Sequence, residues 1–147
     1  MHRLAPGRGV VLRDGSDAVI FGYGPIMLSE AWRAADLLAQ RHGIGLRVVN
    51  LPWLNRVDDD WLRDTVRGYD RVFTLDNHYV DGGQGEMLAA RLAEVGLAPG
   101  VELRRLGLTD IPVSGQNDEA LRAHGLDADG ISRAVVAGAA VRAGEAG

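Results

Sequence analysis

The segment Val72-Phe-Thr-Leu-Asp-Asn-His-Tyr-Val-Asp-Gly-Gly-Gln-Gly85 decides the fold class of this 147-residue chain. The apolar run Arg71–Leu75 predicts a buried strand, and the glycines predict a turn that opens a helix near Glu86. Between them we expect a polar loop that holds Asp76, Asn77, His78 and Asp81. Loops at the carboxyl ends of strands in α/β sheets bind ligands and partners, so this loop is the first candidate for a functional site.

Outside this segment, strands alternate with helices. Apolar runs predict strands over residues 10–12, 18–21, 46–51, 71–75 and 101–106. Helical spacing predicts helices over residues 26–41, 61–67, 86–96, 118–124 and 128–141. Strand–helix–strand units of this size form parallel pairs with right-handed crossovers. The short turn Asp14-Gly15-Ser16 instead predicts a hairpin, so we expect the first two strands to pair antiparallel.

These elements predict an α/β fold. We expect a three-layer sandwich with about five strands, mostly parallel, with one antiparallel edge strand. Residues 1–8 read as an N-terminal arm or linker, residues 9–141 as one domain, and residues 142–147 as a frayed tail.

The helix boundaries carry recognisable capping residues. Pro25 suits a first helical turn, and Gly43 suits a helix end. Asp58-Asp59-Asp60 offers N-caps to the helix that follows, and Asn117 and Asp127 are expected to cap the last two helices. A metal site at the acidic triplet is the less favoured interpretation, because three consecutive residues cannot all face one ion.

Composition excludes several classes of protein. The chain has no cysteine, which removes thiol nucleophiles, disulfides and cysteine-ligated metals. All 16 basic residues are arginine, so a P-loop lysine and a Schiff-base lysine are absent. The net charge of −4 and the absence of a basic stripe argue against a nucleic-acid partner. No run reaches the length of a membrane span, and no signal-like segment is present, so a cytoplasmic protein is the default expectation.

The glycine turns and His78 leave alternatives open. Gly22-Tyr-Gly24 and Gly83-Gln-Gly85 lack the third glycine of a dinucleotide fingerprint and read as tight turns. Anion binding at the Glu86 helix start remains open, although Asp81 opposes it. His78 with Asp76 and Asp81 suggests a metal or catalytic cluster, but a histidine bonded to loop backbone is the favoured interpretation. Trp53, Trp61 and Tyr79 predict either core packing or an exposed interface patch.

Four segments, in order, resemble the C-terminal domain of transketolase and its thiamine-diphosphate-dependent relatives. The segments are Asp14–Gly24, Val48–Trp53, Val72–Gly85, and Gly107–Gly115 followed by Ala123–Ile131. The resemblance covers about Val10 to Ala140. It implies a five-stranded sheet with one antiparallel strand, in agreement with the pattern above.

The resemblance also implies a role. Enzymes of this family hold thiamine diphosphate and Mg²⁺ between a diphosphate-binding and a pyrimidine-binding domain, and this sequence lacks the Gly-Asp-Gly metal motif of the first. We therefore expect the chain alone to bind no cofactor and no metal and to contain no catalytic residue. Candidate interface residues are Trp53, Asp76, Asn77, His78, Tyr79, Asp81, Gly82, Gly83 and Gly85, and His78 is the candidate at the substrate entrance. The chain has Asp76-Asn77 where close relatives have two acids.

Three functions follow as hypotheses. The first is a C-terminal subunit or domain of a split transketolase-type enzyme, inactive alone, which joins subunits carrying the other two domains in a homo- or hetero-oligomer. The first residues favour a natural split over an excised domain. The second is an independent α/β module that binds a small anion or nucleotide at the Gly82–Gly85 turn. The third is a regulatory remnant without an enzyme partner.

Overall fold

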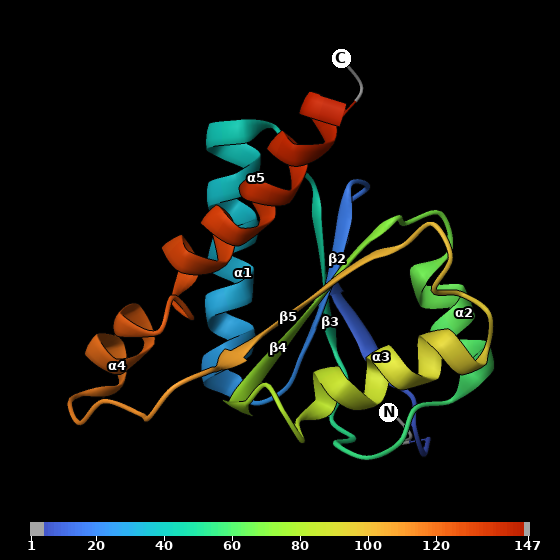
Figure 1. Ribbon diagram of the computed structural model, residues 1–147, viewed down its shortest axis with the longest axis horizontal. Coiled ribbons are helices and arrows are strands. Elements are labelled where there is room, and N and C mark those ends of the chain that lie inside the picture. The colour runs from blue at the N-terminus through green and yellow to red at the C-terminus, as the bar shows by residue number, and fades with distance from the viewer. Residues whose placement is uncertain (1–4, 146–147) are drawn as a thin grey trace.

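The computed structural model describes residues 5–145 and the side chains of residues 5–138. The elements, in chain order, are β1 (Val10–Arg13), β2 (Ala18–Gly22), α1 (Pro25–His42), β3 (Leu46–Asn50), α2 (Asp59–Val66), β4 (Arg71–Tyr79), α3 (Gln84–Glu94), β5 (Glu102–Leu108), α4 (Asn117–Ala123) and α5 (Ala128–Glu145). Figure 1 shows these elements around one twisted sheet. The described part has no helix long and apolar enough to cross a membrane.

The sheet has the strand order β1-β3-β2-β4-β5. β2, β3, β4 and β5 run parallel, and β1 pairs antiparallel with β3 at one edge. This confirms the predicted fold class, a mostly parallel sheet with one antiparallel edge strand. β5 forms the opposite edge, and its partly exposed residues suit that position.

The predicted hairpin between the first two strands is wrong. β1 pairs with β3, with Val10 opposite Asn50, and β2 lies on the other side of β3. The burial of the two strands explains this arrangement. Every residue of β2 is buried, so β2 is suited to the centre of the sheet between two parallel neighbours, whereas β1 is largely exposed and suits an edge.

Helices cover both faces of the sheet, and each face has its own core. On one face, Ile20, Val48 and Phe73 pack against α1 and the first half of α5. On the other face, Phe21 and Val72 pack against α2 and α3. Figure 1 shows α1 and α5 on one side of the sheet and α2 and α3 on the other. Because successive residues of a strand face opposite ways, neighbouring residues such as Ile20 and Phe21 serve different cores.

Most of the predicted capping residues are confirmed, although the helix ends themselves differ from the predicted ones by one or two residues in most cases. Pro25 is the first residue of α1, and Gly43 follows its end in the left-handed conformation, with φ 64°. Oδ1 of Asp58 accepts the Trp61 N–H at 2.8 Å, and Oδ1 of Asp127 accepts the Gly130 N–H at 2.9 Å. The predicted cap by Asn117 is wrong, because the residue lies one position inside α4 and Gln116 occupies the cap without a side-chain bond.

The chain ends differ in part from the predicted arm and tail. α5 extends to Glu145, beyond the predicted end at residue 141. At the other end, the carbonyl of Gly7 accepts the Asp58 N–H at 2.8 Å, so the arm contacts the start of α2. Residues 1–4 and 146–147 lie outside the described residues.

The largest correction concerns the segment after Leu75. Instead of ending there, β4 continues to Tyr79, so Asp76, Asn77 and His78 lie in a strand and not in a loop. β5 extends beside them: Tyr79 pairs with Leu108 after an irregularity in register, and the Val80 N–H donates to the Leu108 carbonyl at 3.0 Å. The backbone of the polar residues is therefore held at the carboxyl end of the sheet, beside the edge strand β5.

Candidate functional site

Asp76 is the centre of the candidate site. Its side chain is fully buried at the carboxyl end of the sheet. Oδ1 accepts hydrogen bonds from the Gln84 N–H at 2.8 Å and the Tyr23 hydroxyl at 2.9 Å, and Oδ2 accepts the Gly85 N–H at 2.9 Å. A carboxylate at this position satisfies two free N–H groups of the first turn of α3 and faces the positive end of its dipole.

The glycines before and inside α3 allow this close approach. A Cβ atom on Gly83 would lie 2.7 Å from the carboxyl carbon of Asp76, and one on Gly85 would collide with Oγ1 of Thr74. Gly82 has a φ of 81°, and its N–H donates to Oε2 of Glu86 at 2.5 Å. The group that comes close to Gly83 and Gly85 is therefore the chain's own Asp76.

Tyr23 is partly buried beside Asp76. Burial of the phenol, followed by the negative charge of Asp76 and the hydrogen bond to it, raises the pKa of Tyr23 to about 12. The hydroxyl is therefore protonated at neutral pH and donates a hydrogen bond to the carboxylate. Sequence reasoning did not select Tyr23, although a polar aromatic residue inside the turn Gly22-Tyr-Gly24 was the available signal.

Gln84 joins this site to the loop after β3, and sequence reasoning also missed it. Its side-chain amide donates to the carbonyl of Leu51 at 2.7 Å and to the carbonyl of Trp53 at 2.8 Å. The ring of Trp53 is half-buried against the core under α2 and α3. Within residues 5–138, the indole N–H of Trp53 has no hydrogen-bond partner.

The exposed aromatic patch predicted from three residues does not form as one surface. Trp61 packs into the core, with its ring edge-on to Phe21 at 6.1 Å between centroids. Trp53 contributes to the same core, so core packing accounts for both tryptophans. Tyr79 remains 42% exposed.

The remaining predicted polar residues are exposed, whereas Asp76 is buried. Asn77 and His78 are exposed, and the ring of His78 packs edge-on against Tyr79 at 5.7 Å between centroids. Asp81 is almost fully exposed and lies 3.8 Å from the guanidinium of Arg105. A cluster of Asp76, His78 and Asp81 is therefore not assembled, and in the described part of the chain no three metal-binding side chains converge.

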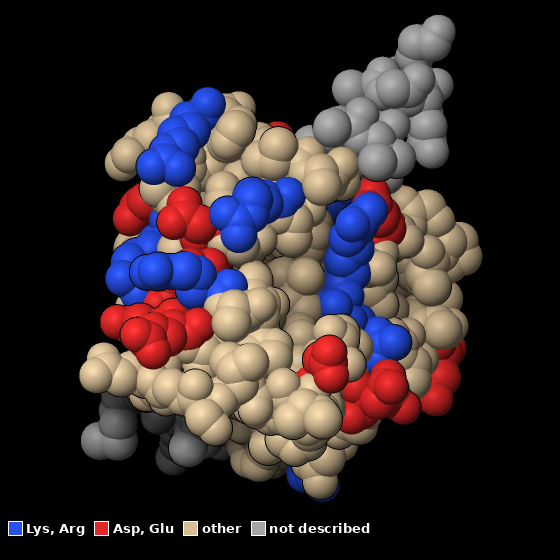
Figure 2. All heavy atoms as spheres, turned by 60° about the vertical axis from the view of Figure 1, so that its left-hand side comes forward, with Lys and Arg blue, Asp and Glu red and all other residues tan. Residues whose placement is uncertain are grey.

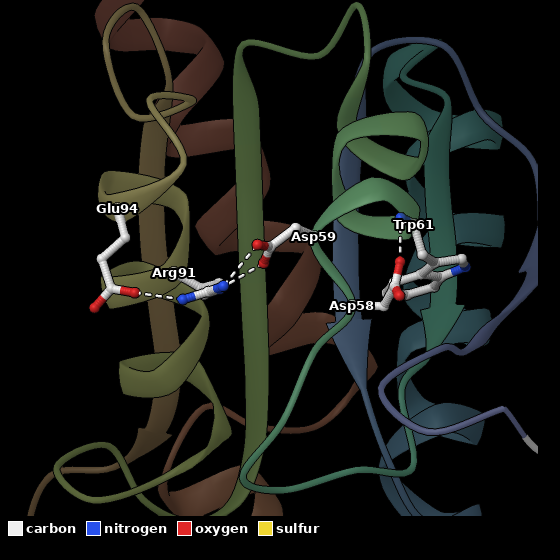
Figure 3. A network of polar contacts seen from close by, with 5 residues as sticks. All are labelled: Asp58, Asp59, Trp61, Arg91 and Glu94. Carbon is white, nitrogen blue, oxygen red and sulfur yellow. Dashed lines mark hydrogen bonds and ion pairs between the residues drawn. The ribbon is translucent and has the colours of Figure 1, made fainter.

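The acidic triplet before α2 is a capping and pairing element. Asp58 caps α2, while Asp59 makes two hydrogen bonds of 2.5 and 2.6 Å with Arg91 of α3 (Figure 3). Arg91 also bonds Glu94 at 2.6 Å. The hydrogen bonds from Arg91 lower the pKa of Asp59. The carboxylates of Asp59 and Glu94 in turn raise the pKa of Arg91. This network ties α2 to α3 across the surface of their shared core.

At the start of α3, a carboxylate of the chain itself occupies the place where an anion could bind. The N–H groups of Gln84 and Gly85, which open α3, already bond Asp76. A phosphate at the same place would meet a buried carboxylate, and like charges repel strongly at low dielectric. The geometry stabilises the α3 start and leaves exposed His78 and Tyr79 beside it.

Comparison with known proteins agrees with this geometry. Residues 7–131 match the family model "Transketolase, C-terminal domain". The chain is 38% identical over 130 residues to 1-deoxy-D-xylulose-5-phosphate synthase of Syntrophotalea carbinolica, covering 88% of this chain and 20% of that protein. It is 37% identical over 128 residues to transketolase of Rattus norvegicus, covering 86% and 20% respectively. The chain thus spans about a fifth of the length of these relatives.

Shorter relatives match as well. A protein of Methanocaldococcus jannaschii named putative transketolase C-terminal section is 31% identical over 131 residues, covering 88% of this chain and 39% of that protein. The solved structure "Split gene transketolase, inactive beta4 tetramer" superposes with a TM-score of 0.79 at 33% identity, covering 91% and 43% of the two chains. The chain belongs to the transketolase C-terminal domain family.

Proposed function

We propose that this chain is the C-terminal part of a split transketolase-type enzyme that depends on thiamine diphosphate. In this proposal a second polypeptide of the same organism, the companion polypeptide, carries the diphosphate- and pyrimidine-binding domains. The names of two relatives support it, since one is a C-terminal section and another comes from a split gene. The reaction class is transfer of a ketol unit, the location is the cytoplasm, and the substrate is a sugar phosphate or an oxoacid.

The observation that carries the proposal is that Asp76 already occupies the N–H groups at the start of α3. A chain that bound a diphosphate by itself at the edge of its sheet would offer free N–H groups there. Here Asp76 takes the N–H groups of Gln84 and Gly85, so the residues present do not fit the diphosphate of the cofactor. The role left to this domain is to contact and support the polypeptide that does bind it.

Two features support association with other chains. The chain spans only part of each relative, and a structure of the same family is described as an inactive tetramer of β subunits, so such chains associate with one another without forming the active enzyme. In the assembled enzyme we place His78 and Tyr79 near the substrate entrance, because both are exposed at the carboxyl end of the sheet. The cofactor would supply the carbanion chemistry when bound between the companion's domains.

The anion-binding module, the second hypothesis from the sequence, has less support. It requires the Gly82–Gly85 turn to present free N–H groups to a ligand. Gly82, Gln84 and Gly85 all donate to carboxylates of the chain itself.

The test is a pair of titrations by calorimetry. Thiamine diphosphate with Mg²⁺ is added to the isolated chain, and the companion polypeptide is added to the chain in a second cell. We expect no binding of the cofactor and clear binding of the companion. Cofactor binding by the isolated chain, or a companion that does not associate with it, would overturn the proposal.

A further inference from the structure

A small apolar hollow lies at the carboxyl end of the sheet, between α1 and α4. It measures about 150 Å³ and is lined by Ile26, Asn77, Leu108, Pro112, Asn117, Ala120, Leu121, His124 and Leu126. None of these residues is an aspartate, a glutamate or an arginine. We call this cavity the α4 hollow. It is separate from the buried carboxylate of Asp76, which is not among its lining residues.

Exposed aliphatic side chains stand beside the α4 hollow. Ile111 is 79% exposed, Val113 is 47% exposed, and Ile26, which also lines the hollow, is 45% exposed. Figure 2 turns α4 and the segment before it toward the viewer, and the lower middle of this face is largely free of charged side chains. Ile111 and Val113 are the sequence neighbours of Pro112, which lines the hollow, and exposed apolar side chains next to a hollow are typical of a contact site for another molecule.

The walls of the α4 hollow are held in place by hydrogen bonds. Nε2 of His124 accepts the Val113 N–H at 3.3 Å, which fixes the extended segment against α4. The carboxylate of Asp110 accepts the N–H of Ile111 at 2.7 Å, which fixes the turn before it. A preformed hollow loses less conformational entropy on binding than one that must be ordered first.

The charges nearby indicate what kind of surface fits. Residues 108–125 carry three carboxylates, Asp110, Asp118 and Glu119, against one arginine, Arg122. A second copy of this chain meeting the same face would bring like charges together, which opposes association. A partner with basic side chains beside an apolar one would meet opposite charge at the rim.

We infer that the α4 hollow receives an apolar side chain of the companion polypeptide, flanked there by basic residues. This inference rests on the proposed function. A cavity of about 150 Å³ is large enough for benzene, and six of the nine residues that line this one are apolar, so a leucine or phenylalanine side chain has a suitable size. The relatives have four fifths of their length outside the matched segment, so a domain of this family meets a much larger body of protein.

The experiment fills the hollow or makes its rim polar. Ala120→Trp places an indole in the hollow, and Ala123→Trp, on the exposed side of the same helix, is its control. Ile111→Asn removes the exposed apolar side chain without adding a charge, and Thr109→Asn is the control at an exposed position nearby. Because Ile111 is exposed, this variant tests the surface even where Ala120→Trp does not fold, and circular dichroism checks each fold.

The measurement is the affinity of each variant for the companion polypeptide by calorimetry. We expect Ala120→Trp and Ile111→Asn to weaken binding about tenfold or more, as for a hot-spot contact, and both controls to stay within about twofold. Equal affinity of Ile111→Asn and the unchanged chain would overturn this inference alone. Self-association of the chain that Ile111→Asn abolishes would also overturn it, in favour of a second copy. No binding by the unchanged chain would overturn the proposed function as well.

Discussion

The hydroxyl of Tyr23 donates a 2.9 Å hydrogen bond to the Asp76 carboxylate, and this bond joins the turn after β2 to the end of β4. The same carboxylate holds the first turn of α3. Two βα connections that lie 53 residues apart in the sequence therefore share one buried charge. In this domain a side chain occupies the place where many α/β proteins hold a ligand anion.

Replacing Asp76 by asparagine tests that role. The substituted amide would keep the size of the side chain, but it would offer one acceptor oxygen in place of two and lose the charge that faces the helix dipole. We expect Asp76→Asn to lower the free energy of unfolding by about 2 kcal/mol, measured by urea denaturation. Asp81→Asn, the same change at an exposed carboxylate, should shift it by less than about 0.5 kcal/mol. Equal effects of the two variants would contradict the capping role.

The raised pKa of Tyr23 predicts a loss of stability at alkaline pH. Its pKa in the folded chain, about 12, lies above the ordinary value of 10.0. The fold therefore favours the protonated phenol, and this contribution is complete below pH 10 and is lost as the pH rises toward 12. We expect the unchanged chain to lose more unfolding free energy than Tyr23→Phe over this range. Parallel curves for the two proteins would contradict the raised pKa of Tyr23. Tyr69, whose pKa is also raised by burial, is present in both proteins and therefore does not affect the difference between them.

Gly85 predicts a steric limit on the start of α3. A methyl group at this position would collide with Oγ1 of Thr74 and crowd Asp76. We expect Gly85→Ala to destabilise the domain by about 2 kcal/mol through overpacking, despite the better helix propensity of alanine. Gly22→Ala is the control, because a Cβ there would meet its nearest neighbour, Leu28, at an ordinary 3.5 Å. Thermal unfolding of both variants measures the difference, and a neutral Gly85→Ala would contradict the geometry.

Asp59 predicts a contribution at acid pH. Its hydrogen bonds from Arg91 lower its pKa below 3.8, so the stabilisation is present above the ordinary pKa and is lost as the pH falls through the folded one. We expect Asp59→Asn to lower the melting temperature at about pH 6 and low salt, with a difference that shrinks at about pH 2 and at high salt. Asp60→Asn, at the exposed neighbour, serves as the control, and a pH-independent difference would count against the ion pair.

His78 predicts a change in catalysis only in the assembled enzyme. Because its side chain is exposed, His78→Ala should change the unfolding free energy by less than about 0.5 kcal/mol. With the companion polypeptide, a residue at the substrate entrance should affect KM more than kcat. His42→Ala is the control, because His42 is the last residue of α1 and lies away from the carboxyl end of the sheet. A fall in kcat with unchanged KM would contradict the placement of His78.

The sequence allowed the layers and most element boundaries to be predicted, because those depend on local patterns. Pro25, Gly43, Asp58 and Asp127 act within one helical turn of their positions, and the structure confirms each. The partner of β1 was predicted wrongly because chain proximity favoured a hairpin, whereas the complete burial of β2 required a central position.

The candidate site was predictable only in part. Asp76 was selected because it follows an apolar strand, but its polarity suggested a loop. Its burial depends on donors from Tyr23, Gln84 and Gly85, and contacts over such separations leave no periodic signal in the sequence. His78 and Asp81 were grouped with it by spacing, yet both side chains are exposed on the surface.

Ketol transfer by the companion polypeptide, titrated with this chain, tests the central claim most directly. The assay contains thiamine diphosphate, Mg²⁺, a ketose phosphate donor and an aldose phosphate acceptor, and the product is measured as the chain is added. We predict no activity from this chain alone and activity that rises to a plateau near one chain per companion. Full activity of the companion without this chain, or none at any ratio of two polypeptides that bind each other, would contradict the account.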